Sequence, residues 1–333
     1  MKGIRLLVML FSFIILLTGC GSGGNAPTKA ESAEPKQEQN QNQAQGDVRS
    51  IEHLKGTQEI KGTPKRIVAL EWSVVEDLLA LGIQPVGVAE LDGYDKWVNV
   101  KHKLDSNVVD VGGRVEPNIE VISSLEPDLI IGVDRIEAFY DELQNIAPTL
   151  LFHAATEQNP DAYALMEKNF RMVANAVNKQ EEGEKVLQEV NGEIEKLAQK
   201  VKELGKADSE YVLVQAYSSD KAPVMRFMVD HAMSAQVFNK LGMKNAFQPK
   251  QYVPTFEEGT AETLLNMKQV NFFYIVQDDD NIFENQMKEN PVWKNLDFVK
   301  ENRTYAMGGD TWLFGGPLSA QLIAEKAVAA LSK

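Results

Sequence analysis

The feature that most constrains the fold is a regular alternation of short apolar and longer amphipathic segments between Arg66 and Gly132. The apolar segments at 66–70, 83–88 and 128–132 are rich in β-branched residues, and each begins within two residues of a glycine or a proline. Between them, apolar side chains recur at the spacing of one helix face. This alternation predicts βαβ units on a parallel sheet.

Aromatic and basic residues come where these strands end. Trp72, Trp97, Arg114 and Arg135 stand directly after a predicted strand or in the loop that follows one. Ligands of parallel sheets bind beyond the carboxyl ends of the strands. We therefore expect two indoles and two guanidiniums at one rim, a combination that suits a bulky anion with an apolar body.

Two of these residues also have a purely structural interpretation. Trp72 at a strand-to-helix turn could pack in the core, and Arg114 could form an ion pair with Glu116 or Asp110. Arg114 follows two glycines, which allow the backbone to turn sharply and to approach a ligand closely. Both interpretations stay open at this level.

The amino terminus has the pattern of an export signal. Lys2 and Arg5 precede the apolar run 6–17, which is too short for a comfortable membrane span, and the tetrapeptide 17–20 ends the segment at Cys20. We expect a signal peptide over residues 1–19 and lipidation of Cys20, the single cysteine of the chain. A plain signal peptide with an incidental cysteine is the alternative. Segment 20–50 is poor in large apolar residues and predicts a flexible, lipidated tether.

The remainder divides into an N-terminal lobe (51–160), a helical connector (161–204) and a C-terminal lobe (205–333). The second lobe repeats the pattern of the first weakly, and this places Glu120 and Glu262 at the same position in the two halves. We expect either matched carboxylates that face one partner, or two ordinary glutamates that interact with helix dipoles.

The second lobe contributes its own candidate ligand contacts. Trp312 and Phe314 stand in a glycine-bracketed loop after a predicted strand, where aromatic side chains can line a cleft. Tyr217 follows another strand, and Arg226 and Tyr252 come later in the same half.

Several functional classes find no support in the sequence. The formal charge of −14 argues against nucleic acid as a partner. The four histidines are scattered, and no metal-binding, phosphate-binding or nucleophile-elbow motif occurs. We therefore expect no metal site, no resident cofactor and no enzymatic activity.

The chain resembles the helix-linked substrate-binding proteins of ABC importers, and among them the ferric-siderophore receptors of the hydroxamate and iron-dicitrate type. The resemblance covers residues 62–333 and rests on the segments 66–72, 79–83, 110–120 and 312–320. It implies an α/β fold of two βα lobes with central sheets, joined by a long rigid helix, with the ligand cleft between the lobes. It further implies a monomeric lipoprotein on the extracytoplasmic face of the cell membrane.

The resemblance also implies roles for individual residues. Trp97, Arg114, Trp312 and Phe314 match ligand contacts of that family. Glu120 and Glu262 match the carboxylates that dock onto arginines of the permease. The iron is coordinated by the siderophore, so no metal ligand is implied in the protein.

One departure bears on the ligand. Where the hydroxamate receptors have a tyrosine, this chain has Arg135-Ile136, and the second lobe adds Arg226. The extra arginines favour a citrate-hydroxamate or ferric citrate. Haem or a corrinoid is the alternative ligand, with Tyr94, Tyr217 or Tyr252 as the axial group for haem. A surface adhesin or structural lipoprotein is the alternative class.

Overall fold

The computed structural model describes residues 48–220 and 222–333. The predicted signal peptide, Cys20 and the tether up to residue 47 lie outside the described residues. The first element is an antiparallel hairpin of β1 (Val48–His53) and β2 (Gly56–Lys61), in which Val48 pairs with Lys61. The hairpin therefore begins inside the segment 20–50 that the sequence assigned to the tether. Arg49 anchors it, because its guanidinium donates a hydrogen bond to the carbonyl of Ala176 at 3.2 Å.

The N-terminal lobe contains the parallel sheet that the alternating pattern predicts. Its strand order is β5-β4-β3-β6-β7, and every neighbouring pair is parallel. The strands are β3 (Ile67–Ala69), β4 (Gly87–Val88), β5 (Val109–Asp110), β6 (Leu129–Val133) and β7 (Thr149–Phe152). The helices are α1 (Trp72–Ala80), α2 (Leu91–Trp97), α3 (Ile119–Ser124), η1 (Asp134–Phe139) and α4 (Tyr140–Gln144).

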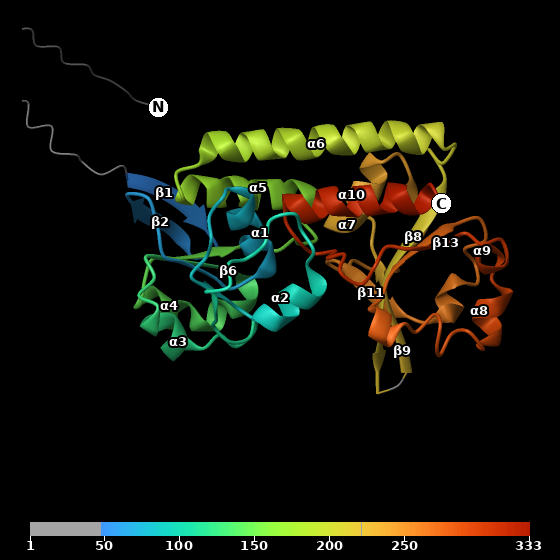
Figure 1. Ribbon diagram of the computed structural model, residues 1–333, viewed down its shortest axis with the longest axis horizontal. Helices are drawn as coiled ribbons and strands as arrows, with labels where there is room; N and C mark the ends of the chain where they lie inside the picture. The colour runs from blue at the N-terminus through green and yellow to red at the C-terminus, as the bar shows by residue number, and fades with distance from the viewer. Residues whose placement is uncertain (1–47, 221) are drawn as a thin grey trace, which may run out of the picture. The chain divides into compact units, whose positions relative to one another are not determined.

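Two helices form the connector. Helix α5 (Ala162–Ala176) is followed by α6 (Gln180–Glu203), and Asn178 turns the chain between them with a φ of 59°. Helix α6 has acidic residues in its first turn and lysines in its last turn, which matches the polarity of the helix dipole. It packs on α5 and on α10 (Pro317–Leu331), running alongside both (Figure 1).

The C-terminal lobe has a mixed sheet. Its strand order is β11-β9-β8-β12-β13, and β10 also pairs with β8. Its strands are β8 (Glu210–Ser219), β9 (Ala222–Met228), β10 (Lys244–Asn245), β11 (Phe256–Gly259), β12 (Asn271–Ile275) and β13 (Thr304–Ala306). Its other helices are α7 (Met233–Lys240), η2 (Ala261–Leu264), η3 (Asp278–Asp280), α8 (Pro291–Asn295) and α9 (Asp297–Lys300). The antiparallel strands β9 and β11 were not predicted, because Pro223 and the polar run at Glu257 are untypical of strands.

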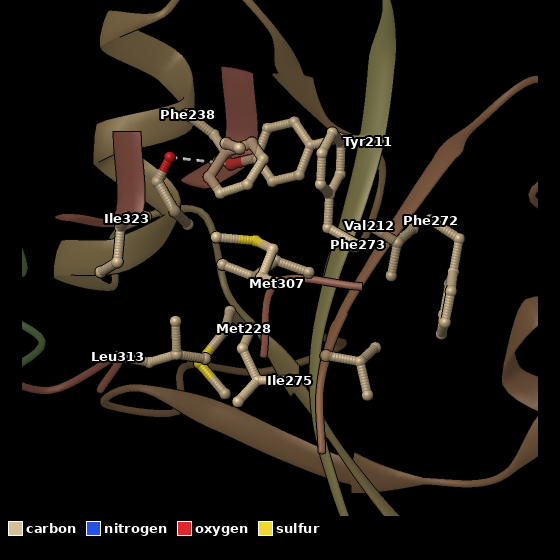
Figure 2. Close-up of a cluster of buried hydrophobic side chains, with 14 of the residues drawn as sticks. Tyr211, Val212, Met228, Phe238, Phe272, Phe273, Ile275, Met307, Leu313 and Ile323 are labelled. Carbon is tan, nitrogen blue, oxygen red and sulfur yellow. Dashed lines mark hydrogen bonds between the residues drawn. The ribbon is translucent and has the colours of Figure 1, made fainter. Parts of the chain in front are cut away.

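Aromatic rings dominate the core of this lobe. Figure 2 shows Tyr211 beside Phe238, whose ring is stacked on it with centroids 4.6 Å apart. The buried hydroxyl of Tyr211 donates a hydrogen bond to the carbonyl of Ala235 at 2.8 Å. On the other side of the sheet, Phe272 stacks on Phe298 with centroids 5.2 Å apart. This packing supports the strand ends and the loops that follow them.

The start of α5 depends on a side-chain cap. The carboxylate of Asp161 accepts a hydrogen bond from the backbone N–H of Ala164 at 2.8 Å. We expect Asp161→Ala to lower the free energy of unfolding by about 1 kcal/mol, since an N–H of the first turn then loses its partner. Chemical denaturation measures the effect. Asp161→Asn keeps an acceptor at the same place and is the control, so equal losses in the two variants would contradict the capping role.

Candidate ligand-binding site

A cavity of about 400 Å³ lies between the two lobes. Its volume is within the range of small-molecule binding sites. The N-terminal lobe contributes Glu71, Arg114 and Arg135 to its lining, and the C-terminal lobe contributes residues of β9, β11 and the loop before α10. The helix α5 closes one side with Leu165 and Met166. The cavity thus lies where the carboxyl ends of the first-lobe strands meet the second lobe.

Glu71 is the centre of the charged wall on the N-terminal side. It follows β3 directly and caps α1, because its Oε1 accepts the backbone N–H of Trp72 at 2.9 Å. The same oxygen accepts from Nη1 of Arg114 at 3.1 Å, while Oε2 lies 3.1 Å from Nη1 of Arg135. The Glu71 side chain is only 7% exposed. One buried carboxylate therefore holds two guanidiniums at the cavity.

Arg114 is fixed from several directions. Its Nε donates to Oε2 of Glu90 at 2.8 Å, and its guanidinium carbon lies 3.5 Å from the ring centroid of Trp72. It forms ion pairs as the structural interpretation proposed, but with Glu71 and Glu90 instead of Glu116 or Asp110. These contacts leave it on the cavity wall. A guanidinium that is held flat presents a planar fork of donors to oxygen ligands.

Arg226 occupies the facing wall in the C-terminal lobe. Its guanidinium carbon lies 4.8 Å from the ring centroid of Tyr217 and 4.7 Å from that of Phe256. Its Nε donates to Oε1 of Glu258 at 3.3 Å, and the hydroxyl of Tyr217 donates to the same oxygen at 3.3 Å. The pairing of arginine with carboxylate is thus repeated on both walls.

An aromatic cluster joins the two walls. Trp312 lines the cavity, and its ring centroid lies 4.7 Å from that of Trp72, 5.0 Å from that of Phe314 and 6.4 Å from that of Trp97. Phe314 also lines the cavity. These rings give the site an apolar surface beside its arginines.

The structure brings five of the predicted contact residues into the cavity lining: Arg114, Arg135, Arg226, Trp312 and Phe314. Four others stand outside the lining: Trp72, Trp97, Tyr217 and Tyr252. Trp72 is buried and donates its Nε1–H to the carbonyl of Ala89 at 3.1 Å, so it supports Arg114 from behind. Trp97 packs behind Trp312, and Tyr252 stacks on His231 with centroids 4.9 Å apart.

Sequence reasoning missed Glu71, Asp77, His153 and Phe256 as lining residues. A signal was present for Glu71, since it directly follows a strand in the way that marked the other candidates. Phe256 lies in β11, which the sequence did not reveal.

Two acidic residues of α1, Glu76 and Asp77, lie against the start of α10, and Asp77 also lines the cavity. The carboxylate of Glu76 is fully buried and accepts hydrogen bonds from Gly316 N at 3.1 Å, Ser319 N at 3.0 Å and Ser319 Oγ at 2.7 Å. Burial raises the pKa of Glu76 to about 7. Burial, together with the neighbouring Glu76, raises the pKa of Asp77 well above its ordinary value. A side chain at Gly315 would collide with the Glu76 carboxylate, so glycine permits this contact.

A second set of contacts joins the lobes near α2. Asn99 donates its backbone N–H to the carbonyl of Asp310 at 3.2 Å and its side-chain amide to the Asp310 carboxylate at 2.5 Å. Lys326 of α10 donates to the same carboxylate at 2.5 Å. Hydrogen bonds therefore join the lobes at two places, one at Glu76 and one at Asn99.

Glu120 and Glu262 are both exposed, each in the first turn of a short helical segment of its lobe. The hydroxyl of Thr260 holds the pKa of Glu262 below its usual value.

Within residues 48–220 and 222–333, no group of three or more His, Cys, Asp or Glu side chains is placed to hold a metal ion. In the same part of the chain, no helix combines the length and hydropathy that crossing a membrane requires.

The sequence model of the periplasmic binding protein family matches residues 67–311, a range that contains the whole cavity lining except residues 312–316. The chain belongs to this family. Its predicted membership among substrate-binding proteins is confirmed, and the protein is a binding protein rather than an enzyme. The predicted two-lobed α/β fold is confirmed as well.

Individual relatives and solved structures are similar to this chain over most of its length. The chain is 30% identical to the Fe(3+)-citrate-binding protein YfmC of Bacillus subtilis over 93% of this chain and 91% of that protein. It is 29% identical to the probable siderophore-binding lipoprotein YfiY of the same organism, over 96% and 94% of the two chains. The crystal structure of FhuD from Vibrio cholerae with bound Fe3+-Desferal superimposes with a TM-score of 0.71 at 25% identity. That superposition covers 80% of this chain and 97% of FhuD.

Proposed function

We propose that this family member binds a ferric siderophore in the cavity and delivers it to an ABC importer for iron uptake. The observation that carries the proposal is the position of Arg114, which lines the cavity while two carboxylates and the Trp72 ring fix its guanidinium. A chelated ferric ion presents charged oxygens inside an organic shell. The charged oxygens can accept hydrogen bonds from the guanidiniums of Arg114 and Arg135. The organic shell can pack against the rings of Trp312 and Phe314.

A hydroxamate or citrate-hydroxamate complex fits the charge of the walls. Each of the three cavity arginines already has a carboxylate within ion-pair distance. The ligand therefore meets arginines whose charge is already compensated rather than three uncompensated cations. Ferric citrate is the alternative within the same class, and the name of the Bacillus subtilis relative YfmC supports its inclusion.

The proposal also includes docking of the protein on a permease and its anchoring to the membrane. The exposed carboxylates of Glu120 and Glu262 suit arginines of a permease, one from each lobe. Lipidation of Cys20 would hold the protein at the extracytoplasmic face of the membrane, and a relative of comparable length is named a lipoprotein. We expect the protein to act as a monomer that serves a membrane partner.

Titration with a panel of ferric complexes tests the ligand class. The panel contains a citrate-hydroxamate, a linear trihydroxamate, a catecholate, ferric citrate and hemin. We expect the citrate-hydroxamate or the trihydroxamate to quench tryptophan fluorescence at stoichiometric concentration, because Trp312 lines the cavity. Trp312→Phe should reduce the quenching while calorimetry still detects binding. Quenching by hemin alone would favour the haem alternative, and binding of no member would contradict the proposal.

A further inference from the structure

We infer that Glu71 sets the charge of the chelate that the cavity accepts, a specificity role that rests on the proposed function. Arg114 lies in the loop after β5 and Arg135 lies in η1 after β6, and both reach the same carboxylate. An anionic ligand at this wall must share these two guanidiniums with Glu71. The carboxylate thus opposes the attraction that the arginines exert on negative charge.

The charges of the ion-paired side chains on this wall balance, and Asp77 and Asp134 line the cavity beside them. Glu71 and Glu90 face Arg114 and Arg135, which gives two carboxylates and two guanidiniums. Removing the charge of Glu71 leaves one positive charge in excess among these four side chains. Glu71 is only 7% exposed, so solvent screens this excess charge weakly. Coulomb's law gives the interaction of this excess charge with a negative charge on the ligand. At an effective dielectric constant of ~20 and a distance of ~10 Å, the affinity changes roughly tenfold for each negative charge.

Glutamine is a suitable replacement at this position. It has nearly the shape of glutamate, and its carbonyl oxygen can still accept the backbone N–H of Trp72 that starts α1. The Glu71→Gln variant is therefore expected to keep the fold and lose the charge. Glu71→Asp keeps the charge on a shorter side chain and serves as the rescue variant.

The experiment compares two ligands of different charge. Dissociation constants are measured by calorimetry for a linear ferric trihydroxamate, whose iron core is neutral, and for ferric citrate, whose complexes are anionic. In Glu71→Gln, we expect the ratio of the two affinities to shift toward ferric citrate by about tenfold per unit of ligand charge. Glu71→Asp should restore the wild-type ratio.

Glu258→Gln is the matched control, because it removes the same charge from the partner of Arg226 on the opposite wall. The Glu258 side chain is 54% exposed, so solvent screens it and the ratio should change much less. Equal factors for both ligands in Glu71→Gln would overturn the inference, since a structural defect weakens both alike. Wild-type protein that binds neither ligand would instead overturn the proposed function.

Discussion

Replacing Arg114 by alanine is expected to weaken binding of the ferric complex by roughly 100-fold. Truncating one member of a buried, hydrogen-bonded charge pair costs ~2–5 kcal/mol. Here the loss has two sources: the ligand loses its donors, and Glu71 and Glu90 lose a partner. Fluorescence or calorimetric titration with the tightest ligand of the panel measures the change.

Arg114→Lys separates charge from geometry. Lysine keeps the positive charge but lacks the planar fork that lies over the Trp72 ring. An intermediate loss is expected, smaller than that of the alanine variant. A folded Arg114→Ala protein with wild-type affinity for every complex would show that the ligand does not bind at this wall.

Replacing Glu76 by alanine is expected to lower the free energy of unfolding by about 3 kcal/mol, because buried donors left without an acceptor are costly. The change removes the acceptor of three hydrogen bonds at the start of α10. Ser319→Ala is the comparison, since it deletes only the hydroxyl donor and should cost about 1 kcal/mol. Equal small losses in both variants, measured by denaturant unfolding, would contradict the importance of this carboxylate.

The same site predicts a pH dependence of stability. The pKa of Glu76 is about 7 in the folded protein and near 4.5 in the unfolded chain, so the folded state binds the proton more tightly. The stability that this proton provides is complete below pH 4.5 and is lost as the pH rises to about 7. Asp77 contributes in the same direction, and Glu71 and Tyr94 are the other charged or titratable groups coupled to Glu76. Glu76→Gln should flatten this part of the profile.

The sequence predicted β3, α1, β4, α3 and β6 of the first lobe because these elements are locally encoded, but the segment with Trp97 was expected as a loop and forms α2. The β-branched run at β3, the helical face of α1 and the glycine that follows it agree with one another, so pattern and structure coincide. The hairpin β8–β9 was missed for the opposite reason. Its second strand contains Pro223 and Arg226, and tertiary pairing with β8 overrides that local composition.

The sequence predicted which residues lie at the site better than it predicted the contacts that these residues make. The rule that ligands bind after parallel strands led to Arg114 and Arg135, and both line the cavity. The same rule could not tell that Trp72 would turn into the core, because that depends on the backbone carbonyl of Ala89 that receives its indole N–H. Nor could it reveal Glu71 as the shared partner of two arginines. Charge pairing between distant loops exists only after the chain has folded.

The contact between Glu76 and the start of α10 joins the first helix of the described residues to the last. The bonded groups are 240 to 243 residues apart in sequence. The Glu76 carboxylate of α1 therefore has none of these three donors until the start of α10 is in place. Such long-range closure slows folding, since the chain entropy is lost before the contact forms. A chain that stops short of Gly316 would lack the donors that helix α1 needs.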